Sequence, residues 1–379
     1  FVEYGLTTAY ELGSLLSSTS ATAHSVPLTG LVEGETYHYR VTAEDSAGNP
    51  ATSGDETFTT TTGGPSVDIW YGDSQSFGAL GNPQRWVNVL GRVSDPDGLS
   101  VLTFSLNGGA PQDLSVGPFR RLAEPGDFNV EIDYQDLSPG SNTIQVRAVD
   151  GLGFETVKTV TVDYTDGTEW PIPTQVRWST ANEISDVAQV VDGRWSIVGG
   201  ELRNDLDRYD RLVAIGDLAW TEYEVTVPVT VHSIDPAGFG GINGAPGVGV
   251  FLRWTGHFDW NGFQPTYGYY PIGGGGWLEF ASNGNGEIRL EDFTPGGLIR
   301  FDPLQRVISV GTRYIWKIRV ESLGGNTTQY SMKLWVDGTP EPSTWEIVGD
   351  ETGDLPGGAV ALVAHFADVR VGDRVSDPI

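Results

Sequence analysis

The sequence lacks cysteine and has few cations, and each shortage excludes a class of function. Without cysteine there is no disulfide framework, no thiolate metal site and no cysteine nucleophile. Lysine and arginine total 22 against 50 aspartates and glutamates, a formal net charge of −28. That balance excludes a nucleic-acid partner, whose backbone needs clustered cations, and argues against docking on anionic lipid. No apolar run approaches the ~20 residues that cross a bilayer, so no membrane insertion is expected.

The abundance of glycine, proline and aromatic residues predicts an all-β protein. The chain has 51 glycines and 22 prolines beside an aromatic fraction of 11%, which is typical of folded, turn-rich chains. Two segments rich in structure breakers, Thr57–Pro65 and Tyr164–Thr174, have the composition of linkers. We therefore predict three domains, over residues 1–63, 64–166 and 167–379. Because the chain starts at Phe1 without a methionine, we expect a processed product or a fragment.

The first segment contains one clear half-buried strand. Apolar residues alternate there with polar ones, at Tyr37, Tyr39, Val41 and Ala43. With Leu31 and Gly34 before it, this stretch resembles the second half of a fibronectin type III module. The resemblance implies that the Tyr37 hydroxyl caps the backbone at a corner.

A module of that kind needs roughly 100 residues, and only about 60 are present. We expect two strands to be missing and core residues to be exposed. Three explanations stay open: a longer polypeptide precedes Phe1, a neighbouring chain donates the strand, or the module is partly disordered.

The second segment has the same construction. Val87, Val89, Gly91 and Val93 alternate with polar or outward residues before the turn Asp95–Gly98. This segment resembles a bacterial immunoglobulin-like module over about residues 64–166, which implies a second small β-sandwich.

The third segment consists of many long alternating strands without a helical period. Such a pattern predicts two packed antiparallel sheets, a jelly roll. Examples of inward-facing sets are Val248, Val250, Leu252 and Trp254, and Val360, Leu362, Ala364 and Phe366. The strings YIWKIRVES and GGAVALVAHFADVRV resemble laminin-G-like, concanavalin A-like domains of secreted bacterial proteins. That fold hosts lectins, binding modules, glycosidases and lyases, so the resemblance fixes no activity.

Catalytic patterns are scarce. The retaining glucanases of this fold carry E-x-D-x-x-E on a strand, and no such string occurs in the jelly-roll segment. We interpret Glu131–Asp136 and Glu287–Asp292 as solvated acids. The five histidines are dispersed, and each is interpreted as structural or exposed. We predict no catalytic residues and lean towards a protein that is not an enzyme.

Aromatic residues gather between Phe251 and Tyr270, in a segment rich in glycine and proline. Flat rings match the apolar faces of sugars, and planar polar side chains match their hydroxyls. Rings that simply close one end of the sandwich are the alternative, and Trp254 is predicted to lie in the core. As carbohydrate-binding residues we predict Arg253, His257, Trp260, Tyr267, Tyr269 and Trp277.

The resemblance to laminin-G-like domains also implies a structural Ca²⁺ between the first and last strands. Asp368 matches an acid in the ending of such domains, and Asp186 or Asp192 would be its partner. Acidic, turn-rich sandwiches supply the oxygen ligands that Ca²⁺ takes.

We therefore predict an extracellular or cell-surface protein whose C-terminal jelly roll binds a polysaccharide or glycan without chemistry, held out by two small spacer modules. A structural alternative is a subunit of a filament or surface assembly, in contact with neighbouring copies or upstream modules. A third is an accessory or divergent polysaccharide-degrading domain.

Overall fold

The computed structural model describes residues 1–17, 21–60, 63–240, 244–258, 264–268, 272–294 and 297–373. Within those ranges the regular structure is strands and three single-turn 3₁₀ helices, with no α-helix, so the predicted all-β class is confirmed. No helix in the described part is long and apolar enough to span a membrane. The 3₁₀ helices are η1 (Tyr134–Asp136), η2 (Ile184–Asp186) and η3 (Pro236–Gly238).

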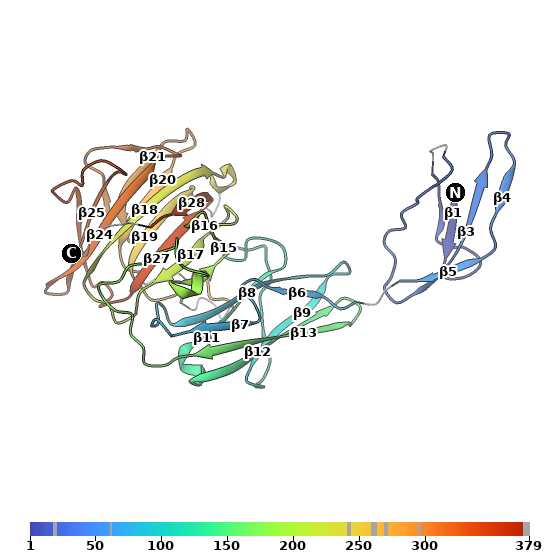
Figure 1. Ribbon diagram of the computed structural model, residues 1–379, viewed down its shortest axis with the longest axis horizontal. Coiled ribbons are helices and arrows are strands. Elements are labelled where there is room, and N and C mark those ends of the chain that lie inside the picture. Colours follow the sequence, from blue (N-terminus) through green and yellow to red (C-terminus); the bar gives the residue numbers. More distant parts are fainter. Residues whose placement is uncertain are drawn as a thin grey trace.

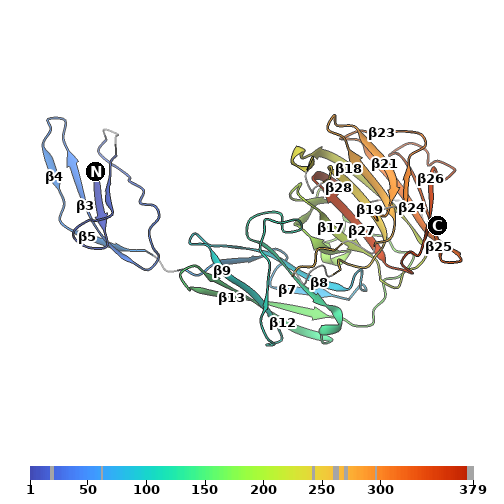
Figure 2. The same ribbon diagram turned by 180° about the vertical axis from the view of Figure 1, so that it is seen from behind.

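The first region forms a single sheet, which lies away from the other sheets in both views (Figures 1 and 2). Its order is β2-β1-β3-β4, and β5 pairs with β3. The strands are β1 (Val2–Gly5), β2 (Gly13–Leu15), β3 (Thr36–Glu44), β4 (Pro50–Thr52) and β5 (Glu56–Thr59).

The expected exposure of core residues is present in this sheet. Tyr37 is buried, whereas Leu16 is 76% exposed and Val41 is 40% exposed. The Tyr37 hydroxyl accepts a hydrogen bond of 2.8 Å from the backbone N–H of Val32, as the family resemblance implies. A single sheet has no second layer to cover its apolar face, and its apolar side chains therefore remain exposed to solvent.

The second region is a sandwich of two sheets, with orders β10-β9-β12-β13-β7 and β11-β8-β6. Val87, Val89 and Val93 all point into its core, as the alternation predicts. The sequence has glycine at position 91 because a Cβ there would collide with the ring of Phe128. The strands are β6 (Ser66–Ile69), β7 (Ser74–Phe77), β8 (Trp86–Ser94), β9 (Leu99–Leu106), β10 (Gln112–Asp113), β11 (Asp127–Asp133), β12 (Gly140–Asp150) and β13 (Glu155–Tyr164).

The third region is a larger sandwich of two antiparallel sheets (Figure 1). A continuous apolar core lies between the sheets. The eight-stranded sheet has the order β14-β17-β27-β19-β20-β21-β22, with β23 paired to β21. Its strands are β14 (Gln189–Asp192), β17 (Arg211–Ile215), β19 (Gly247–Trp254), β20 (Gly275–Phe280), β21 (Gly286–Glu291), β22 (Ile299–Phe301), β23 (Val307–Ile308) and β27 (Ala359–His365).

The facing seven-stranded sheet has the order β15-β16-β28-β18-β24-β25-β26. Its strands are β15 (Trp195–Val198), β16 (Glu201–Asn204), β18 (Tyr223–Ile234), β24 (Arg313–Gly324), β25 (Thr327–Val336), β26 (Ile347–Thr352) and β28 (Ala367–Val371). Long antiparallel strands with one apolar face make this two-layer packing the stable arrangement.

A buried network of ions joins the second region to the third. Arg121 of the second region contacts Glu131 at 2.7 Å and Asp192 of the third region at 2.6 Å. His257 bonds the other oxygen of Asp192 at 2.8 Å. Burial alone would raise the pKa of Asp192, but Arg121 and His257 outweigh it and lower that pKa. The second region is therefore packed directly against the sandwich of the third region, and its role as a spacer stays a prediction.

Candidate functional site

The candidate site is a groove on the outer face of the eight-stranded sheet, with a volume of about 650 Å³. Its floor belongs to a second apolar cluster, separate from the core between the sheets. Phe251, Trp277 and Val363 come from β19, β20 and β27 and lie in both the cluster and the groove. Both faces of these strands are apolar, which matches their near-continuous hydrophobic sequences.

Two glycines of β19 make room for the floor. A Cβ on Gly249 would meet the rings of Phe251 and Trp277, and one on Gly247 would meet Trp277. The alternation of β19 thus places Val248 and Val250 inward and leaves small residues outward, next to the large ring on β20. The hollow follows from this pairing of glycine with tryptophan.

Charged side chains line one wall of the groove. Arg289 on β21 lies between Glu279, at 2.8 Å, and Glu291, with which it forms a short ion pair. Burial raises the pKa of the Glu291 carboxyl, and the neighbouring guanidinium only partly offsets that rise. The interpretation of Glu291 as a solvated acid was wrong, because this side chain is buried beside Arg289.

The opposite part of the groove contains a histidine–aspartate pair. His365 Nδ1 lies 2.7 Å from Asp210 Oδ1, and both residues are buried. The Tyr209 ring packs edge-on against His365, with 5.1 Å between ring centroids. Burial, and then the charge of Asp210, raises the pKa of the Tyr209 hydroxyl. Asp210 has a φ of +34°, a backbone conformation that costs energy in a residue other than glycine.

The second region also contributes to this site. Arg120 lines the groove, and the neighbouring Phe119 packs edge-on against Tyr267, with 5.3 Å between ring centroids. The segment around Tyr267 is fixed by Glu131, which accepts hydrogen bonds of 2.7 Å from the backbone N–H and the hydroxyl of Thr266.

Two of the predicted carbohydrate-binding residues, Tyr267 and Trp277, line the groove, although each is only 6% exposed. The rings that are only half-buried in the groove are Tyr209, Phe258 and Phe293, which sequence reasoning did not select. Trp260 and Tyr269 lie outside the described residues.

Arg253 and His257 do not face a ligand surface. The Arg253 guanidinium is enclosed and bonds Asp354 at 3.0 Å and Thr328 at 2.8 Å. His257 is fully buried and belongs to the ion network around Asp192. Both side chains therefore stabilise the fold, which corrects their prediction as sugar contacts.

The three predicted calcium ligands are not brought together. Asp368 pairs with Arg203 at 3.0 Å, and Asp192 pairs with Arg121. Asp186 caps η2 by accepting from the backbone N–H of Glu183 at 3.3 Å, and it also accepts from the backbone N–H of Asn182 at 2.9 Å. Residues in the described ranges form no group of three or more His, Asp or Glu side chains suited to a metal. The structure gives calcium no support at these positions.

No family model and no curated protein matches the sequence. Among solved structures, alginate lyase Aly36B is 15% identical with a TM-score of 0.29, and the alignment covers 54% of this chain and 98% of the lyase. A carbohydrate-binding module of the β-sandwich superfamily is 10% identical with a TM-score of 0.19, covering 82% and 96%. A tetra-tandem repeat from the extending region of a large adhesion protein is 14% identical with a TM-score of 0.21, covering 93% and 84%. Likenesses this weak assign no activity to the chain.

Proposed function

We propose that the groove on the eight-stranded sheet binds a polysaccharide chain outside the cell. The observation that supports this is the combination of half-buried rings at Tyr209, Phe258 and Phe293 with polar side chains in one hollow. Sugar rings stack on aromatic faces through their CH groups, and their hydroxyls bond carboxylate and guanidinium groups. A volume of about 650 Å³ is sufficient for a few sugar units.

Binding to a panel of neutral and acidic polysaccharides tests this proposal. We expect Phe258→Ala and Phe293→Ala each to weaken binding at least tenfold, about 1.4 kcal/mol, because each removes a stacking surface. Phe154→Ala is the matched control, since this half-buried ring belongs to the second region and does not line the groove. Equal losses in all three variants, or no binding to any polysaccharide, would contradict a sugar site in the groove.

The pair formed by His365 and Asp210 favours a second function, cleavage of the bound chain. A histidine whose Nδ1 is held by a carboxylate is suited to act as a general base or acid at the atoms it faces. His365→Gln is expected to abolish the release of new chain ends and to leave polysaccharide binding within about threefold of wild type. If the wild-type protein generates no new chain ends from any polysaccharide that it binds, cleavage is contradicted and the groove is a binding site alone.

A further inference from the structure

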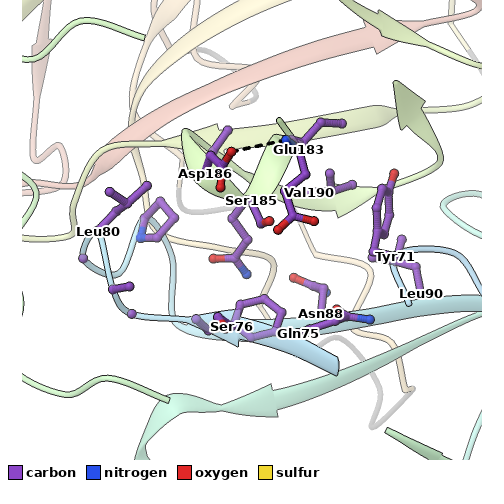
Figure 3. A pocket seen from close by; sticks show the side chains of 18 of the residues that line it. Tyr71, Gln75, Ser76, Leu80, Asn88, Leu90, Glu183, Ser185, Asp186 and Val190 are labelled. Atoms are coloured by element: carbon purple, nitrogen blue, oxygen red, sulfur yellow. Dashed lines mark hydrogen bonds between the residues drawn. The ribbon is translucent and has the colours of Figure 1, made fainter. Parts of the chain in front are cut away.

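A second hollow lies where the second region meets the third (Figure 3), and we name it the junction pocket. One wall is formed by β7 and β8 and includes Gln75 and Ser76; the facing wall is formed by η2 and includes Ser185 and Asp186. Its volume is about 650 Å³, which is within the usual range for small-molecule sites. The groove does not share any lining residue with it.

Hydrogen bonds between the two regions hold the walls of the junction pocket in place. The Tyr71 hydroxyl donates to the Gly193 carbonyl at 3.3 Å and accepts from the Trp195 N–H at 2.8 Å. Gln189 Nε2 donates to the Trp86 carbonyl at 2.7 Å. The pocket is therefore pre-formed by the packing of the two regions, and binding there would not require a large rearrangement.

Hydroxyl and carboxylate oxygens are among the polar atoms of the lining that remain available to a ligand. The hydroxyls of Ser74, Ser76 and Ser185 make no hydrogen bond to any residue in the described ranges. Asp186 uses Oδ2 to accept from two backbone N–H groups and keeps Oδ1 as an acceptor. Such a set favours a ligand that presents many hydrogen-bond donors.

The charge of the lining residues limits which of these ligands can bind in the junction pocket. Glu183 and Asp186 line the pocket, and no lysine, arginine or histidine is among the lining residues. An anionic ligand would meet two carboxylates without a compensating cation, which disfavours it. Aromatic side chains, among them Trp70 and Tyr71, complete the lining and offer apolar surface.

We infer that the junction pocket binds an uncharged saccharide. Its hydroxyls bond the three serines and Asp186, and its CH faces lie against the aromatic side chains. This site is separate from the groove, whose lining contains both basic and acidic side chains. One chain would then hold two sugar sites, one of them at the seam between two regions.

Titration calorimetry with cellobiose, maltose, lactose and N,N′-diacetylchitobiose tests this inference, with glucuronic acid and glucosamine as charged probes. We expect at least one uncharged disaccharide to bind. Ser76→Trp and Ser185→Trp, which fill the pocket from opposite walls, should each weaken that binding at least tenfold. Both serines are exposed, so the larger side chain does not disturb a core.

Two variants separate this site from general effects and from the groove. Ser100→Trp places the same ring at an exposed position on β9, and Phe293→Ala alters only the groove; both should bind the disaccharide as wild type does. If neither blocking variant weakens binding, or if no uncharged sugar binds, the inference is overturned. Tighter binding of glucosamine than of every uncharged sugar would overturn it as well, because the pocket would then be a cation site.

Discussion

At the scale of single residues, Glu351 on β26 stands out because its surroundings favour the neutral form of its carboxyl and so raise its pKa. Burial, a hydrogen bond to Asp292 and the charge of Asp354 raise its pKa to about 8, and Arg253 only partly opposes this rise. In the unfolded chain the same group titrates near 4.5. Between these two values the native state therefore holds a proton that the unfolded state has lost.

The consequence is a loss of stability with rising pH. Because the native state binds the extra proton, the free energy of unfolding contributed by Glu351 is full below about pH 4.5 and falls as the pH rises to about 8. Glu351→Gln keeps a neutral side chain at every pH. Thermal melts should show the variant gaining stability over wild type as the pH is raised from about 5 to about 9. A difference in melting temperature that stays constant across that range would show that Glu351 is already ionised in the native protein.

At the scale of strands, alternation predicted β19 correctly up to Leu252 and then failed. A bulge shifts the register between Leu252 and Trp254, and Arg253 adopts a φ of +59°. Trp254 is buried as predicted, but it packs with Phe251 in the outer cluster and not with Val250 between the sheets. Arg253 turns instead to Asp354. A strict period of two contains no signal for such a bulge. The directions of the Arg253 and Trp254 side chains therefore could not be predicted from the sequence.

The close packing around the glycines of β19 can be tested by substitution. Gly249→Val would drive its side chain into Phe251 and Trp277 and should destabilise the protein by ~1–3 kcal/mol, as overpacking does. The displaced Trp277 ring should also weaken polysaccharide binding. Gly54→Val is the control, because a Cβ at Gly54 meets no atom within 4 Å. Urea unfolding that gives equal stability for the two variants would contradict the close packing of the groove floor.

At the scale of the whole molecule, the sequence indicated the strands and the sandwiches but not how two regions combine. Alternation is local, so it identified Val87, Val89 or Leu362 as inward without reference to any partner. The groove instead gathers Arg120, Tyr209, Arg289 and His365, which are far apart in the chain. Arg120 and Tyr209 lie in loops, His365 ends β27, and Arg289 lies within β21. Pairing β20 with β21 would have placed Arg289 beside Trp277, but that register was not evident from either strand alone.

The ion network makes the second and third regions depend on each other. Arg121→Met would leave Glu131 and Asp192 buried without their guanidinium, a loss that costs about 3–5 kcal/mol for pairs of this kind. Arg147→Met is the matched control, because its ion pair with Glu155 has both side chains more than 40% exposed and should contribute about 0–1 kcal/mol. Calorimetry should show Arg121→Met lowering a transition that the two regions share, with weaker polysaccharide binding, because Glu131 also fixes Thr266 next to Tyr267. Two independent transitions, of which only one shifts, would mean that the regions fold separately and that the groove does not need the second region.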